Sequence, residues 1–188
     1  MKVGIIALSF GIGKDGPGLS NSDLANSIEW LLISLKKPPG GLSDVKAVFQ
    51  WEIAAEINIR PHELTRTSSC LVKTVYGKAG QYLDSATVIA EAKEPLADAD
   101  EIYIVAMPFL HGWLCKRLAE KACLHNVKVY KDHKINFDLR SMQWWTRGPI
   151  RLLIYSALHM IFRSSKGRSL FWDNPPEWVK QLKFEQTT

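Results

Sequence analysis

The sequence predicts an α/β fold, and three observations together support this. Short apolar runs alternate along the chain with segments whose apolar residues recur at helical spacing. The first run, residues 3–10, is largely apolar, which is typical of a strand covered on both faces. Loops containing glycine or proline separate the elements, as residues 11–18 do after the first strand. We therefore expect a three-layer, Rossmann-like parallel sheet with helices on both faces.

The individual elements follow from the same patterns. The expected strands are residues 3–10, 45–50, 69–75, 101–107 and 127–131, of which 69–75 lies in an ambiguous stretch. The expected helices are residues 20–35, 51–59, 83–96, 109–123 and 146–162. Ser20 or Asn21 can cap the first helix, and residues 37–41 end it. Because right-handed crossovers place the carboxyl ends of parallel strands at one edge, the loops after the strands meet there.

Length and composition predict one globular domain, residues 1–165, followed by a C-terminal extension, residues 166–188. The chain has 188 residues, of which 46% are hydrophobic and 23% are charged, as in ordinary globular proteins. The longest apolar segment, residues 150–162, is too short to cross a bilayer and contains Arg151 and His159. The N-terminus is interpreted as a strand and not as a signal peptide. A cytoplasmic protein without a transmembrane segment is therefore expected.

Charge divides the chain into two parts. Residues 1–110 contain 10 Lys/Arg and 13 Asp/Glu, a balance of −3, whereas residues 111–168 contain 12 and 3, a balance of +9. A basic region can attract a phosphate, a nucleic acid or an anionic membrane surface, and it can equally be a solvated surface. Nucleic-acid binding would rest on this charge and on tryptophans alone, so nucleic acid is not an expected partner.

The glycine-rich loop after the first strand is a candidate cradle for an anion. Gly11 and Gly13 allow backbone N–H groups to approach a ligand, and Ser20 lies at the start of the helix that follows. The pattern ends in Gly16-Pro17, so it is only weak support for a dinucleotide site, and no Gly-Lys-Ser/Thr is present. An ordinary turn is the alternative interpretation.

Two titratable residues follow predicted strands directly, and both are candidate catalytic residues. His111 comes just after the strand at residues 101–107 and is suited to proton transfer, with Arg117 nearby as a charge clamp. Glu52 follows residues 45–50 and could orient His111 across the sheet edge. The alternatives are a structural histidine and an acid that complements a helix dipole.

Further ligand contacts are expected from two polar clusters. Thr87 lies in the first turn of the helix at residues 83–96, where a hydroxyl could face the same edge or serve in capping. Gln143, Trp144 and Arg147 lie in a dense cluster, where arginine can clasp an anion and tryptophan can stack. The alternative is that the paired tryptophans close the core beneath the last helix. The cysteines Cys115 and Cys123 are expected to be buried free thiols, and no metal site is predicted.

These motifs in this order resemble the bacterial YdcF/SanA/ElyC-type family, a Rossmann-like domain of largely unknown function. The matching segments are residues 11–20, Glu52 and residues 84–87, 109–117 and 141–147, within a span of about residues 2–163. The resemblance implies a small polar or nucleotide-like ligand, with S-adenosylmethionine suggested for one member, and a link to the cell envelope.

The sequence thus predicts a protein that binds a small anionic or nucleotide-like ligand at the carboxyl ends of its strands. It leaves open whether the protein is an enzyme, and it identifies no cofactor and no oligomeric state. The alternative function is a non-catalytic interaction protein that uses the basic residues 111–168.

Overall fold

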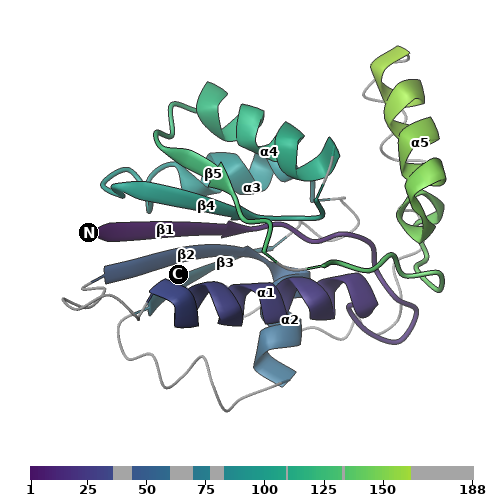
Figure 1. Cartoon of the computed structure of the whole chain (residues 1–188), viewed down its shortest axis with the longest axis horizontal. Helices are drawn as coiled ribbons and strands as arrows, with labels where there is room; N and C mark the ends of the chain where they lie inside the picture. Colours follow the sequence, from purple (N-terminus) through teal and green to yellow (C-terminus); the bar gives the residue numbers. More distant parts are fainter. Residues whose placement is uncertain (36–43, 60–69, 77–82, 109, 133, 162–188) are drawn as a thin grey trace.

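The first predicted strand lies at the centre of the structure. In the computed structural model, β1 (Lys2–Ala7) pairs in parallel with β2 on one edge and with β4 on the other (Figure 1). The full order is β3-β2-β1-β4-β5, and every pair is parallel, which confirms the predicted α/β fold. The other strands are β2 (Asp44–Gln50), β3 (Cys70–Val75), β4 (Glu101–Val105) and β5 (Val127–Val129).

The structure describes residues 1–35, 44–59, 70–76, 83–108, 110–132 and 134–161. The helix stop predicted at residues 37–41 and the extension predicted at residues 166–188 lie outside this part of the chain. None of the helices in the described residues is both long enough and apolar enough to cross a membrane.

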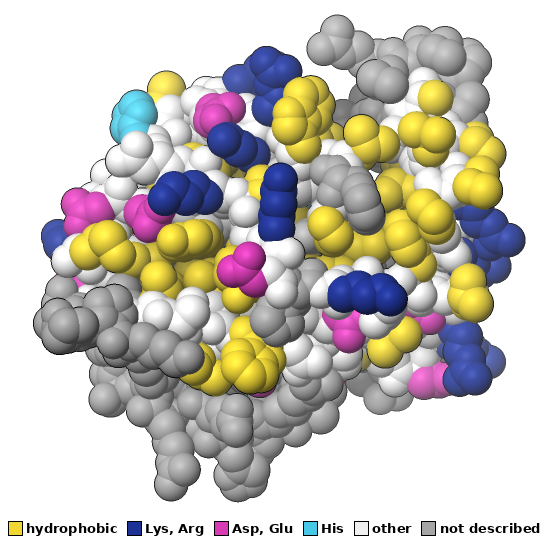
Figure 2. Space-filling model, viewed as in Figure 1, with side chains coloured by type: hydrophobic (Ala, Val, Ile, Leu, Met, Phe, Trp, Pro, Cys, Tyr) yellow, Lys and Arg dark blue, Asp and Glu magenta, His cyan; other side chains and the backbone are white. Residues whose placement is uncertain are grey.

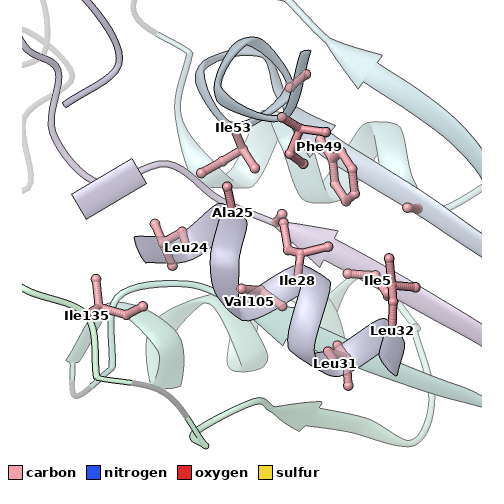
Figure 3. Close-up of a cluster of buried hydrophobic side chains, with 14 of the residues drawn as sticks. Ile5, Leu24, Ala25, Ile28, Leu31, Leu32, Phe49, Ile53, Val105 and Ile135 are labelled. Carbon is pink, nitrogen blue, oxygen red and sulfur yellow. The ribbon is translucent and has the colours of Figure 1, made fainter. Parts of the chain in front are cut away.

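Two layers of helices cover the sheet, as the apolar pattern of β1 predicts. Figure 1 shows α1 (Leu19–Leu35) and α2 (Trp51–Ile59) on one face, with α3 (Ser85–Ala92) and α4 (Leu110–Lys121) on the other. Residues 3–7 of β1 are all buried, because alternate side chains pack under each layer. Under the first layer, Leu24 and Ile28 of α1 pack in one cluster with Phe49 of β2 (Figure 3).

Two predicted helix boundaries are corrected by the structure. The helix expected at residues 83–96 ends at Ala92, three residues before Pro95, which cannot donate a helical hydrogen bond. The helix expected at 146–162 begins instead at Pro149, where the missing N–H costs nothing, and forms α5 (Pro149–Ile161). Just before it, Trp144–Arg147 forms a separate 3₁₀ turn, η2.

The start of α1 is capped from a distant part of the chain, which corrects the prediction for Ser20 and Asn21. Both residues lie inside the helix, and the Asp138 carboxylate accepts the Leu19 N–H at 3.1 Å. Asn21 instead organises the glycine-rich loop: its side chain accepts the Phe10 N–H and donates to the Gly11 and Pro17 carbonyls.

Residues 138–147 pack onto that loop and connect it to α5. The Ser141 hydroxyl lies 2.7 Å from the Thr146 hydroxyl and hydrogen-bonds the Ile12 backbone. The Met142 N–H also donates to the Ile12 carbonyl, at 2.7 Å. Gly11 lies beneath these hydroxyls with a φ of +83°, a backbone conformation that other residues rarely adopt.

Gly11→Ala is expected to destabilise the fold by about 2 kcal/mol or more. The added Cβ would meet the Thr146 and Ser141 hydroxyl oxygens at 2.7 and 2.8 Å, in addition to the strain of the positive φ. Urea unfolding of the variant and the parent at one pH measures the loss.

Gly16→Ala is the matched control in the same loop, because a Cβ there meets nothing within 4 Å. Its stability should stay within about 0.5 kcal/mol of the parent. Equal effects of the two substitutions would contradict the close packing described for Gly11.

Candidate functional site

The candidate site lies where the direction of sheet winding reverses. The chain moves outward from β1 to β2 and β3 and then returns to place β4 on the other edge of β1. The two central strands stay paired as far as the Leu8 N–H and the Val105 carbonyl, which lie 2.9 Å apart. Beyond this point, the segment after β1 forms the glycine-rich loop, and the segment after β4 leads into α4. In doubly wound sheets, ligands bind at such a reversal, outside the carboxyl ends of the strands.

Glu52 is a buried carboxyl group in the first turn of α2, directly after β2. The Gln50 side-chain amide donates to Glu52 Oε1 at 3.3 Å and accepts the Ser9 N–H at 3.1 Å. Within the described structure, Glu52 Oε2 is buried without a hydrogen-bond partner. Burial raises the pKa of Glu52 to about 7, and polar contacts with its own backbone, Gln50 and Ser9 offset only part of this effect.

His111 is the second buried titratable group and lies in the first turn of α4. Its Nε2 is 3.1 Å from the Ser85 hydroxyl, and its ring packs against Phe10 with centroids 5.7 Å apart. The residue keeps partial exposure, but its Nδ1 is shielded from solvent and has no partner among the described residues. Burial lowers the pKa of His111 to about 4, so the imidazole is neutral at neutral pH.

A chain of contacts connects the surroundings of these two groups. The Gln50 amide that binds Glu52 also approaches the Leu83 carbonyl at 3.5 Å, two residues before Ser85. The Ser9 N–H that Gln50 accepts belongs to the residue before Phe10, which packs on His111. The residues after β1, β2 and β4 and the start of α3 thus link the surroundings of Glu52 to those of His111.

The glycine-rich loop is filled by contacts from the protein itself. The Gly13 N–H donates to the Gly16 carbonyl at 3.0 Å and closes a turn. Ser20 donates to the Asn136 carbonyl at 2.7 Å. The first turn of α1, which would attract an anion, already carries the Asp138 carboxylate. These contacts close a turn in the loop and occupy the Gly13 N–H, the Ser20 hydroxyl and the Leu19 N–H.

The residues predicted as further ligand contacts lie in three different places. Thr87 donates its N–H and its hydroxyl to Asp84, which supports the capping interpretation. The Arg117 guanidinium lies 4.9 Å above the Trp113 ring on the exposed side of α4, away from His111. Arg147 donates to the Ser141 carbonyl at 2.6 Å.

The paired tryptophans of the 138–147 segment have different surroundings. Trp145 is buried and stacks on Tyr155 of α5, with centroids 4.7 Å apart, so this tryptophan closes the base of the last helix. Trp144 is half-buried and meets Trp145 edge to face. The Gln143 side chain is buried beside the same turn. Gln143, Trp144 and Arg147 therefore belong to the segment that covers the glycine-rich loop.

Sequence reasoning missed two residues around the site, Ser9 and Gln50, and it considered the hydroxyls of residues 84–87 without pairing Ser85 with His111. Ser9 and Gln50 position Glu52, and Ser85 is the partner of His111. Gln50 carries a usable signal, because it is a polar residue that ends an otherwise apolar strand immediately before an acid. The Ser85–His111 pairing has no sequence signal, since the two residues lie 26 positions apart on different helices.

The cysteines differ from each other in exposure. Cys115 lies one helical turn after His111 and is buried, and burial raises the pKa of its thiol to about 12. Cys123 is exposed with a φ of 64°, so the prediction of burial is wrong for this residue. Within the described ranges, no group of three His, Cys, Asp or Glu residues is placed to hold a metal ion.

Comparison with known proteins returned no match among protein-family models, curated proteins or solved structures. The resemblance to the YdcF/SanA/ElyC-type family stays a prediction that rests on the motifs of this sequence.

Glu52→Gln should change the pH dependence of stability in a defined window. The folded protein keeps the proton of Glu52 up to about pH 7, whereas the unfolded chain loses it near pH 4.5. The parent therefore loses stability as pH rises through this window, and the neutral glutamine does not. The variant should gain up to about 3 kcal/mol relative to the parent between pH 4.5 and 7. Urea unfolding across this range measures the difference.

His111→Gln should give the opposite slope. The unfolded chain binds a proton at this position below pH 6.5, whereas the buried imidazole resists it down to about pH 4. The parent thus loses stability as pH falls from 6.5 to 4, and the variant should gain relative to the parent over that interval. A pH-independent difference for either variant would contradict the burial described for that group.

Proposed function

We propose that the protein binds a small nucleotide-like ligand at the carboxyl ends of β1, β2 and β4. The observation that carries the proposal is the pair of buried, unpartnered polar atoms, Glu52 Oε2 and His111 Nδ1, beside the reversal in sheet order. Each such atom costs about 1–3 kcal/mol when it has no hydrogen-bond partner. A ligand that supplies both partners would recover this cost.

The contacts favour a nucleotide-like ligand over a bare anion. The first turns of α1 and α3 already bind the carboxylates of Asp138 and Asp84. A carboxylate therefore occupies the position at each of these helix starts where a phosphate would bind. The remaining groups are a carboxyl with a pKa of about 7 and a neutral imidazole. A base or a ribose carries the neutral donors and acceptors that such groups bind.

A second candidate function, catalysis, is favoured by the contact between Ser85 and His111. A serine hydroxyl 3.1 Å from an imidazole nitrogen can pass its proton to that nitrogen and attack an electrophilic substrate. A pKa near 4 makes His111 a weak base for this step at neutral pH. Binding requires no such proton transfer, and it is therefore the function we propose first.

Ligand-induced stabilisation tests the proposal directly. The panel comprises nucleosides, nucleotides, S-adenosylmethionine, sugar phosphates and inorganic phosphate, with divalent metal ions screened separately. A ligand at about a hundred times its Kd adds roughly 2.7 kcal/mol to stability, which raises the Tm by roughly 5–10 °C for a chain of this size. We expect nucleosides or nucleotides to raise the Tm and inorganic phosphate alone to leave it unchanged.

Two glutamine variants and one control identify the binding site. Glu52→Gln and His111→Gln should reduce the ligand-induced rise in Tm, because they remove the carboxyl oxygen and the Nδ1 atom. His125→Ala should keep the full rise in Tm. His125 is exposed and precedes β5, so it lies at the amino-terminal end of that strand, whereas the proposed site lies at the carboxyl ends of the strands. A rise in Tm that survives both glutamine variants would place the ligand elsewhere, and a panel without any stabilising nucleoside or nucleotide would contradict the proposal.

A further inference from the structure

The outer side of α5 is apolar, which is the reverse of an ordinary surface helix. Ile150, Leu153 and Ile154 follow i, i+3, i+4 spacing and share one side of the helix, with exposed fractions of 73%, 59% and 47%. The opposite side packs through Leu152 and Tyr155, of which Tyr155 stacks on Trp145. The exposed stripe is therefore additional to the face that holds α5 in place.

The first half of α4 repeats the same arrangement. Leu110, Trp113 and Leu114 have the same spacing and are also exposed. Figure 2 shows hydrophobic side chains gathered on the face over α5 and the neighbouring end of α4. We call these six residues the α4–α5 apolar face. Exposed apolar groups gathered in this way are uncommon on a soluble surface and mark a site of interaction.

All charged residues in the sequence segment that contains α5 are basic. Residues 139–172 contain no Asp or Glu and six Lys/Arg. In the described part of this range, Arg140 and Arg151 are exposed, and Arg151 directly follows Ile150. On α4, Arg117 continues the apolar stripe by one turn and lies over the Trp113 ring. The apolar groups are thus bordered by cations from both helices.

We propose that the α4–α5 apolar face docks on the surface of an anionic lipid bilayer. Helices with Leu, Ile and Trp on one side and flanking arginines lie in the interface plane, where the apolar groups enter the acyl boundary and the cations meet anionic headgroups. The exposed stripe of α5 is aliphatic and lies beside the exposed Arg151, the combination that suits the boundary between acyl chains and anionic headgroups. The described part of α5, with 13 residues, is too short to span a bilayer.

Vesicle co-sedimentation of the full-length protein tests this proposal. We expect binding to vesicles of phosphatidylcholine with phosphatidylserine, weak or no binding to phosphatidylcholine alone, and a fall in binding as salt is raised. Arg151→Gln should weaken binding to the anionic vesicles about fivefold, which corresponds to about 1 kcal/mol for one cation near the surface. Leu153→Ser should also weaken binding to the anionic vesicles.

Ile33→Ser is the matched control, because Ile33 is an equally aliphatic and 42% exposed residue on α1. It should bind vesicles as the parent does, and circular dichroism should show all three variants folded. Equal binding by Leu153→Ser and the parent, or no binding of the parent to anionic vesicles, would overturn the proposal. A concentration-dependent dimer that Leu153→Ser abolishes, without vesicle binding, would assign the face to a second copy of the chain instead.

Discussion

The fold depends on a single constraint, which is that the central strand β1 is buried on both faces and hydrogen-bonded on both edges. Residues 3–7 of this strand are all buried and carry no polar side chain. The neighbouring strands β2 and β4 end at the same level in the register of the sheet. In the described part of the chain, Glu52 and His111 lie just beyond the region where these strands end.

Glu52 and His111 show what that position does to titratable groups. Both lose solvation on entering the protein, and the loss moves their pKa values in opposite directions, toward about 7 and about 4. In each case burial favours the neutral form. The protein thus keeps a protonated Glu52 and a neutral His111 over much of the weakly acidic range. The loss of stability due to Glu52 grows as pH rises through this range, and the loss due to His111 grows as pH falls.

The segment 138–147 links the loop after β1 to α5. Asp138 caps α1, and Ser141 holds the glycine-rich loop. The same segment carries η2 and leads into α5, so the position of the exposed helix depends on contacts with the first loop. The proposed ligand site and the α4–α5 apolar face also share α4, because the adjacent residues His111 and Leu110 lie on its buried and exposed sides. The two proposals therefore involve one common element.

The sequence by itself determined the strands, the helices and the parallel sheet, because apolar periodicity reports burial and burial is local to each element. It also placed Glu52 and His111 in the first turns after β2 and β4, since each follows an apolar run directly. Only the tertiary structure decided the Ser85–His111 contact, the capping of α1 by Asp138 and the outward direction of the α5 stripe. These features join positions far apart in the chain, or depend on which side of a helix packs against a neighbour. The apolar periodicity within one element does not predict long-range contacts or the direction in which a helix faces.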